Sequence, residues 1–287
     1  MIGAIIVTYN PNFKILHQAI KALQNQVNQI CIIDNSSFDY SDFYLTYNNV
    51  KYFPLKKNIG IASAQNIGIQ YFESLGYKFV LFSDQDSIAP DDIVENLYKS
   101  YKEISKKIPN IATIGPLPIN RTTGKEYIYK RNIKKRFPPN TFNVPYTIYE
   151  MYSIISSLSF TKLSTFKEIG YFEEKLFIDG VDNEWCWRSF NKAKLRTFLV
   201  YDLQFSHFQG YSESKSNIKK SNPFRIYYQY RNFIILSKRA YSPLYWKLEN
   251  AIKFLIKLFY YPCFVSPRIQ FLKRILHGCI DGFKNNY

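Results

Sequence analysis

The sequence predicts an α/β fold with a doubly wound, mostly parallel sheet. Short apolar runs of strand length recur along the first 120 residues, and segments with apolar residues at helical spacing separate them. Alternation of this kind is typical of parallel sheets with helices on both faces. Several of the apolar runs also end abruptly at polar or acidic residues, and ligands of open α/β sheets bind at the carboxyl ends of such strands.

The expected elements of the first half follow in chain order. Strands are expected at residues 2–8, 30–33, 51–55, 78–83 and 111–115. Helices are expected at residues 13–23, at 61–75 before Gly76, and from Pro90 onward. The alternation then breaks, because residues 117–147 are rich in proline and basic side chains. We expect a long loop there, or a small excursion over the sheet.

The second half resumes with a different order of elements. A strand is expected at residues 151–160, a short helix at 161–169, a helix at 180–192 and a final strand at 197–201. Gly170 follows the short helix, as glycine often does at a helix C-terminus. Residues 206–221 are polar and rich in Lys and Ser, so a flexible segment is expected there.

The charge of the chain narrows the classes of partner. Its 38 Lys and Arg against 22 Asp and Glu give a net charge of +16. This balance favours an anionic partner: nucleic acid, an anionic membrane surface or a phosphorylated substrate. An AT-rich genome that encodes Lys, Asn, Ile, Tyr and Phe freely would produce the same bias. The chain lacks an RRM, KH or helix-turn-helix signature, so a nucleic-acid-binding protein is the remotest of these readings.

The cysteines and the N-terminal residues indicate a cytoplasmic setting. The four cysteines lie far apart without a CxxC pair, which argues against a zinc site or a disulfide framework and suits a reducing cytosol. The first residues, MIGAIIVTYNPN, read as a strand rather than a signal peptide. No uncharged apolar stretch reaches the ~18 residues that a spanning helix needs.

The last part of the chain is basic and amphipathic. Residues 241–287 hold seven Lys or Arg against two Asp or Glu. Two helical stripes of apolar side chains lie there, Ile252, Leu255, Ile256 and Phe259 followed by Ile269, Leu272, Ile275, Leu276 and Cys279. Two interpretations remain open: these helices lie in a membrane interface, or they dock an apolar face on the body of the protein.

Two carboxylates one residue apart, Asp84 and Asp86, end the apolar run at 79–82. Hard oxygen ligands at such a strand end suit Mg²⁺ or Mn²⁺, which take one or two carboxylates plus substrate phosphates. The alternative is an ordinary polar turn. Polar clusters also follow other expected strands, at 8–10 and 34–35, and a doubly wound sheet would bring these two beside Asp84.

A second acidic centre lies around the helix expected at 180–192. Asp179, Asp182 and Glu184 cluster at its start, and Arg188 lies four residues after Glu184. These side chains either cap the helix and form an i,i+4 ion pair, or one of them is a general base.

Two further polar side chains have open roles. His207 follows an apolar strand and is either a core or solvated histidine or a metal ligand. Arg231 lies in the aromatic segment YYQYRN and either clamps a phosphate or pairs with a buried acid.

The motifs together resemble family 2 glycosyltransferases, and most of all their rhamnosyltransferase branch. The resemblance covers roughly residues 1–235. It rests on VTYN (7–10), DNSS (34–37), NIGIASAQNIG (58–68), FSDQDS (82–87), GYFEEKLFIDGVDNEWCWR (170–188), HFQGYS (207–212) and YYQYRN (227–232), in this order. It implies the GT-A fold, a divalent metal and inversion at the anomeric carbon. Domain 1–240 would then comprise a nucleotide-binding half, 1–116, and an acceptor half, 117–240, followed by the helical extension 241–287.

The resemblance also implies roles for individual residues. The nucleotide sugar would be bound by Thr8, Tyr9, Asn10, Asp34, Asn35, Asn58, Gly60, Asn66, Asp84, Gln85 and Arg231. The metal, Mn²⁺ or Mg²⁺, would be held by Asp86 and His207. Asp182 would be the catalytic base.

The sequence departs from the family pattern in two places. DNSS stands where DNGS is usual, and Val181 stands where the family has a Glu before its base. The missing neighbour charge leaves Asp179 and Glu184 as rival bases to Asp182.

The function that the resemblance implies is transfer of L-rhamnose from dTDP-L-rhamnose to a saccharide, in the synthesis of a cell-surface polysaccharide such as O-antigen or capsule. The acceptor would be linked to a lipid diphosphate, and the enzyme would lie at the inner face of the plasma membrane. The alternative within the family is a UDP-hexose-dependent transferase.

Overall fold

A computed structural model describes residues 1–287 except 122, 127, 129, 208–221 and 285–287. Its strands form one nine-stranded sheet with the order β3-β2-β1-β4-β8-β5-β9-β7-β6. In that order the strands are β3 (Val50–Pro54), β2 (Gln29–Asp34), β1 (Ile2–Thr8), β4 (Phe79–Asp84), β8 (Phe160–Lys162), β5 (Ile111–Asn120), β9 (Arg196–His207), β7 (Ile148–Met151) and β6 (Ile133–Phe137). Most of the expected flexible segment 206–221 lies outside the described residues.

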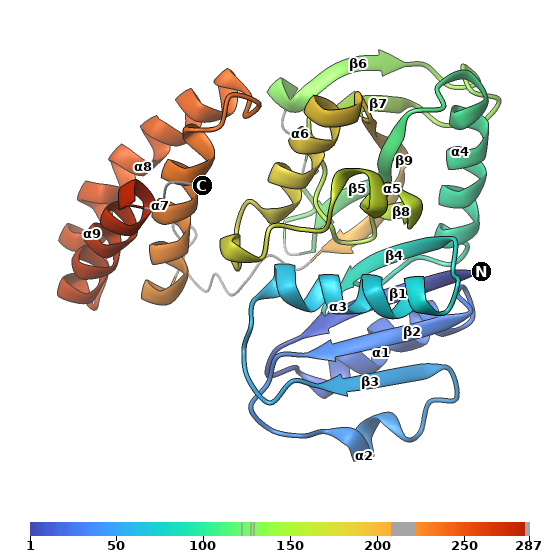
Figure 1. Cartoon of the computed structure of the whole chain (residues 1–287), viewed down its shortest axis with the longest axis horizontal. Coiled ribbons are helices and arrows are strands. Elements are labelled where there is room, and N and C mark those ends of the chain that lie inside the picture. The colour runs from blue at the N-terminus through green and yellow to red at the C-terminus, as the bar shows by residue number, and fades with distance from the viewer. Residues whose placement is uncertain (122, 127, 129, 208–221, 285–287) are drawn as a thin grey trace.

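Helices cover both faces of the sheet, which confirms the predicted fold class (Figure 1). One core cluster packs α1 (Phe13–Gln24) and α4 (Ile93–Lys107) against the sheet. The other packs α3 (Ile61–Ser74), α5 (Ser164–Ile169) and α6 (Val181–Ala193) against the opposite face. The short helix α2 (Ser41–Tyr44) precedes β3.

The first half of the sheet is parallel, as the alternation predicted. β1 pairs in parallel with both β2 and β4, and β2 pairs in parallel with β3. The register places Thr8 beside Asp34 and Val7 beside Asp84. The polar ends of three strands therefore meet at one edge of the sheet.

The second half of the sheet differs from the sequence-based expectation. The prediction of one strand at residues 151–160 is wrong, because β7 ends at Met151 and β8 begins only at Phe160. The chain must leave β7 and re-enter the sheet between β4 and β5, where β8 pairs antiparallel with both. The intervening residues turn, and Leu158 has a positive φ of 55°.

Two further expectations change in the same region. Residues 117–147 contain the end of β5 and the edge strand β6, which pairs antiparallel with β7. The final strand runs to His207, beyond the expected end at residue 201, because its polar end pairs with residues 117–120 of β5. Pairing, rather than apolar patterning, makes this part a strand.

Three C-terminal helices pack together beside the α/β body (Figure 1). They are α7 (Pro223–Ser237), α8 (Leu244–Phe264) and α9 (Arg268–Lys284), and this bundle begins before residue 241. Its core contains Ile226, Tyr230, Phe254, Tyr261, Val265, Phe271 and Ile275. An added Cβ at Gly278 would lie 2.5 Å from the Tyr227 carbonyl oxygen, so glycine permits this close approach of α9 to α7.

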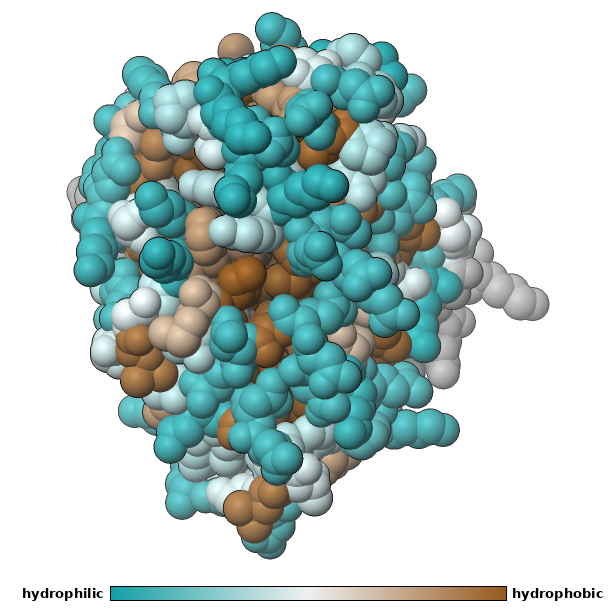
Figure 2. All heavy atoms as spheres, turned by 90° about the vertical axis from the view of Figure 1, so that its right-hand side faces the viewer, coloured by the Kyte–Doolittle hydropathy of each residue, from teal (hydrophilic) through white to brown (hydrophobic). Residues whose placement is uncertain are grey.

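The side of the molecule away from the bundle is mostly hydrophilic, with apolar atoms gathered near a central hollow (Figure 2). The bundle differs, because much of its outer surface is apolar. All four side chains of the first predicted stripe are exposed on α8, whereas Ile275 of the second stripe is buried in the bundle. Packing within the bundle therefore accounts for Ile275, whereas the membrane reading of the exposed side chains stays a prediction.

Candidate active site

The proposed nucleotide end of the site lies where β1 and β2 end. Asp34 is fully buried, and its carboxylate accepts hydrogen bonds from the backbone N–H and hydroxyl of Ser36 (3.0 and 2.6 Å) and from the Tyr52 hydroxyl (2.8 Å). Burial, with the Asp34 charge added to it, raises the pKa of Tyr52. The Ser36 hydroxyl also accepts the backbone N–H of Asn10 at 2.8 Å. The carboxylate is thus held in one orientation between two loops.

Thr8 and Tyr9 complete this end of the site. Thr8 is buried, and half of the Tyr9 surface is exposed. The backbone N–H of Tyr9 donates to the Gln85 side-chain oxygen at 2.8 Å, so Gln85 ties the end of β1 to the loop after β4. Sequence reasoning missed Ser36 and Tyr52 as supports of Asp34, although Ser36 stands within the DNSS motif.

The loop before α3 is shaped by short side chains. Asn35 accepts the backbone N–H of Ile59 at 3.0 Å, and Asn58 accepts that of Gly60 at 3.0 Å. Gly60 has φ of +88°, and an added Cβ would lie 2.7 Å from the Phe177 ring and carbonyl oxygen. Only glycine fits this position without movement.

Asn66, which was predicted to line the nucleotide pocket, is buried between α3 and the residues that follow α5. It is 2% exposed. Its amide donates to the Phe172 carbonyl and to Glu174, and its oxygen accepts the Phe172 N–H, all at 3.0 Å. These contacts join α3 to the segment between α5 and α6.

The carboxylate pair lies at the end of β4. The loop is closed by a bond from the Ser87 N–H to the Asp84 carbonyl (3.2 Å) and is fixed to β9 by a bridge between Ile88 and Ser206. The bridge brings His207 close, with Nδ1 3.2 Å from the Ser87 hydroxyl and 3.9 Å from Asp84 Oδ2.

The electrostatics of the pair differ from those of an exposed turn. Burial raises the pKa of Asp84. Burial and the neighbouring Asp84 raise the pKa of Asp86 to about 6, and His207 and Arg121 act in the opposite direction. Two carboxylates that are this close and partly buried resist simultaneous ionisation unless a cation is near.

The donor set fits a cation that is shared with a substrate. Within the described part of the chain, no group of three or more His, Cys, Asp and Glu side chains is arranged to hold a metal ion alone. Asp84, Asp86 and His207 would leave several coordination positions to other oxygens. This matches the preference of Mg²⁺ for few carboxylates together with phosphates.

Asp182 opens the first turn of α6, close to the carboxylate pair. It lines a narrow cavity with Ser156, Phe172 and Trp185, among others. Its Oδ1 accepts the Asn183 N–H at 2.9 Å. Burial raises the pKa of Asp182 to about 6, and the Asp84 charge adds to this effect. The structure thus brings Asp182 within electrostatic reach of Asp84.

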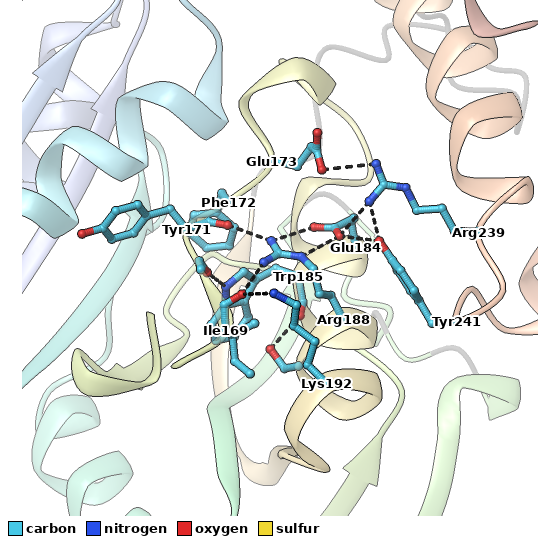
Figure 3. A network of polar contacts seen from close by, with 12 residues as sticks. Ile169, Tyr171, Phe172, Glu173, Glu184, Trp185, Arg188, Lys192, Arg239 and Tyr241 are labelled. Carbon is cyan, nitrogen blue, oxygen red and sulfur yellow. Dashed lines mark hydrogen bonds and ion pairs between the residues drawn. The ribbon is translucent and has the colours of Figure 1, made fainter. Parts of the chain in front are cut away.

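The two rival bases are engaged in ion pairs. Asp179 receives three hydrogen bonds of 2.7–3.1 Å from the Arg225 guanidinium. Glu184 is fully buried and is held by Arg188 (2.8 and 3.0 Å), Arg239 (3.2 Å) and the Tyr241 hydroxyl (2.8 Å), as Figure 3 shows. An acceptor hydroxyl cannot reach a carboxylate so enclosed, which speaks against Glu184 as the base.

Two arginines of α7 lie differently from expectation. Arg231 donates to the carbonyl oxygens of Lys175 and Leu176, so its observed contacts are with the loop before α6; its proximity to a diphosphate stays a prediction. Arg225, which the sequence did not single out, is near enough to Asp84 to lower its pKa against the larger effect of burial.

The fold, the carboxylate pair after β4 and the acidic start of α6 define a GT-A-type glycosyltransferase. The chain belongs to glycosyl transferase family 2, whose family model matches residues 4–165. It is 30% identical to the dTDP-rhamnosyl transferase RfbF of Shigella flexneri over 99% of this chain and 95% of the relative. It is 20% identical to the low-salt glycan biosynthesis hexosyltransferase Agl10 of Haloferax volcanii over 99% and 91% of the two chains.

Solved structures share the fold at low sequence identity. S. aureus TarS 1–349 in complex with UDP-GlcNAc aligns with a TM-score of 0.59 and 16% identity, over 99% of this chain and 80% of that one. GalNAc-T7 with UDP, GalNAc and Mn²⁺ aligns with a TM-score of 0.58 and 16% identity, over 99% and 55% of the two chains. These likenesses establish the fold alone.

The enclosed carboxylate of Glu184 generates a stability prediction. Glu184→Gln removes the buried charge that compensates the guanidinium groups of Arg188 and Arg239, whose side chains are 13% and 16% exposed, and breaking a buried pair costs about 3–5 kcal/mol. Thermal unfolding is expected to show a lowered melting temperature. Glu249→Gln is the matched control, because its ion pair with Arg131 lies at the surface and contributes little. Equal melting temperatures for the two variants would contradict the structural role of Glu184.

Proposed function

We propose that the protein is an inverting rhamnosyltransferase that transfers L-rhamnose from dTDP-L-rhamnose to a saccharide acceptor. The observation that carries the proposal is the 30% identity, over nearly the whole length of both chains, to a dTDP-rhamnosyl transferase. The site supports it, since buried carboxylates cluster where the strand ends of a GT-A sheet meet. Synthesis of a cell-surface polysaccharide, such as O-antigen or capsule, is the role proposed for this reaction.

In this proposal Asp86 and His207 hold Mn²⁺ or Mg²⁺, with Asp84 shaping the loop and contacting the nucleotide sugar. The metal would neutralise charge that develops on the leaving diphosphate. Support comes from the raised pKa of Asp86, about 6, because a nearby cation relieves the repulsion between two close carboxylates. The proposal assigns the base and ribose to Thr8, Tyr9, Asn10 and Asp34.

Asp182 is the proposed general base. It would take the proton from an acceptor hydroxyl that attacks the anomeric carbon from the face opposite the diphosphate. A base works best when its pKa lies near the operating pH, and the pKa of Asp182 is raised to about 6. A single displacement of this kind needs one base and forms no covalent intermediate.

A second donor class is favoured by one observation. The similarity to Agl10, described as a hexosyltransferase, also covers nearly the whole chain, although at 20% identity. A UDP-hexose-dependent transferase would use the same fold and the same carboxylates. The two donors differ in base and sugar, so a binding screen separates them.

A lipid-diphosphate-linked acceptor at the inner face of the plasma membrane is the final part of the proposal. Support comes from the exposed side of α8, where Leu244, Leu248, Ile252, Leu255, Ile256 and Phe259 recur at helical spacing with 57–69% exposure. Further exposed apolar side chains line α9, namely Ile269, Leu272, Leu276, Ile280 and Phe283. Basic residues on the same helices suit an anionic lipid surface, at roughly 1 kcal/mol each. Among the described residues, no helix is long and apolar enough to cross a membrane.

The donor screen tests the function and the metal together. Calorimetry with Mn²⁺ is expected to show tightest binding for dTDP-L-rhamnose among dTDP-rhamnose, UDP-glucose, UDP-galactose and UDP-GlcNAc. Asp86→Ala is expected to abolish the gain in affinity that Mn²⁺ gives. Preference for a UDP-hexose would select the alternative donor class, and an unchanged Mn²⁺ effect in Asp86→Ala would remove that residue from the metal site.

The base assignment predicts a loss of turnover without a loss of binding. Asp182→Asn is expected to lower the rate of sugar transfer, or of donor hydrolysis with water as acceptor, by about 10²–10⁴-fold. Donor affinity should change little. In the wild type the base must be deprotonated, so kcat/KM is expected to fall below about pH 6, where Asp182 and Asp86 take up protons. Near-normal turnover in Asp182→Asn would refute the assignment.

Membrane association is tested with the whole chain and vesicles of stated charge. The triple variant Leu248→Ser, Ile252→Ser, Phe259→Ser is expected to co-float less with anionic vesicles. Each apolar side chain that enters the lipid contributes roughly 1.5–3 kcal/mol to membrane binding, and the variant loses three of them. The matched control is the triple variant Phe38→Ser, Leu45→Ser, Leu75→Ser, whose side chains are exposed on the α/β part of the protein. Equal flotation of both variants would argue against the α8 surface.

A further inference from the structure

The loop that leads into α6 has an unfavourable backbone conformation. It follows the 3₁₀ turn at Glu174–Leu176, and three of its four residues have positive φ: 63° at Phe177, 64° at Asp179 and 87° at Gly180. A non-glycine residue in this region costs about 1–3 kcal/mol, and it persists only where surrounding contacts fix it. Asp182, the proposed base, lies two residues beyond the loop.

One face of α7 supplies those contacts. Residues 225, 228, 232 and 236 recur at helical spacing, and each faces a part of this loop. Arg225 pairs with the Asp179 carboxylate, and Tyr228 stacks on Phe177 with ring centroids 4.7 Å apart. Leu236 lies so close to Gly180 that an added Cβ there would be 2.9 Å from its methyl group.

Asn232 is at the centre of this face. Its side-chain nitrogen lies 2.8 Å from the Leu176 carbonyl oxygen, 2.7 Å from that of Ile178 and 2.9 Å from that of Asp179. Its oxygen accepts from the Arg231 guanidinium at 3.0 and 2.9 Å. The side chain is 2% exposed. One buried amide thus contacts the backbone of residue 176 and of loop residues 178 and 179.

The opposite side of the loop is fixed by the nucleotide half of the chain. The Ile61 N–H, at the start of α3, donates to the Phe177 carbonyl oxygen at 2.8 Å. Gly60 leaves room there for the Phe177 ring. The loop is therefore clamped between α7 and the helix that follows the predicted nucleotide pocket.

We propose that Asn232 is a positioning residue for catalysis, which holds the loop 177–180 so that α6 begins where Asp182 reaches the acceptor hydroxyl. The proposal rests on the proposed function, in which Asp182 is the base. Asn232 touches neither substrate nor reacting atoms. It acts through the loop, since an error of about 1 Å in the position of a catalytic group can lower a rate 10²-fold.

The test compares Asn232→Asp with variants of the same helix. An Asp carboxylate has the same shape but no N–H to donate to the carbonyl oxygens of the loop. We expect kcat for hydrolysis of dTDP-L-rhamnose with Mn²⁺ to fall 10–100-fold, while the calorimetric donor Kd changes less than threefold. Tyr228→Leu keeps the Asn232 contacts but removes the stacking on Phe177, together with the ring contacts to Phe224, Tyr227 and the Arg231 guanidinium, and should lower kcat less. It keeps the test decisive if Asn232→Asp does not fold.

Asn222→Ala is the matched control, because Asn222 caps the N-terminus of α7 but does not contact the loop. It should lower the melting temperature without lowering kcat. An equal fall in kcat for the control and for Asn232→Asp, or unchanged kcat in both loop variants, would overturn the positioning role. Asp182→Asn is measured in the same assay. If it keeps full activity, the base assignment fails and this inference fails with it; if it is inactive while the loop variants are normal, only this inference fails.

Discussion

The arrangement of α5, α6 and α7 depends on the buried carboxylate of Glu184. Removing such a charge from water costs several kcal/mol, which is tolerable only when opposite charge and hydrogen bonds surround it. Arg188 from the same helix and Arg239, which lies just after α7, provide the charge, and Tyr241 adds a hydroxyl (Figure 3). Burial and the Glu184 charge raise the pKa of Tyr241 to about 12, so this hydroxyl remains a donor.

The same network fixes the elements around it. Arg188 also donates to the carbonyl oxygens of Ile169 and Tyr171, and Arg239 also pairs with Glu173 at 3.2 Å. α5, the following loop, α6 and α7 are therefore held by one set of charges. Because α7 is anchored at its C-terminal end by Arg239, its central face can hold the loop before α6 in a conformation that the loop would not adopt alone. Through these contacts the C-terminal bundle is connected to α6, which carries Asp182.

The sequence predicts those features that depend on neighbouring residues and not those that depend on distant pairing. The parallel strands and Asp84 were readable, because an apolar run that stops at an acid is a local pattern. β8 was not, since three residues form a strand only between β4 and β5. Asn232 was also hidden, because its partners are backbone groups more than fifty residues away. The second carboxylate centre was visible, yet only burial and ion pairing separate Asp182 from Glu184.

Without ligands, the carboxylates of Asp84, Asp86 and Asp182 lower the stability of the folded chain. Burial raises the pKa of Asp84, Asp86 and Asp182 above the ordinary range, so each proton is bound more tightly in the folded than in the unfolded state. Stability from Asp86 and Asp182 is therefore greatest at low pH and is lost as the pH rises through about 6. Above that pH Asp86 and Asp182 are ionised, and repulsion by the Asp84 charge adds to the cost of burying them. A ligand that brings a cation to Asp86 would relieve this repulsion and stabilise the fold by mass action. A protein of net charge +16 that gathers two acids at the end of β4 and a third at the start of α6 has thus given up stability where the proposed chemistry requires carboxylates.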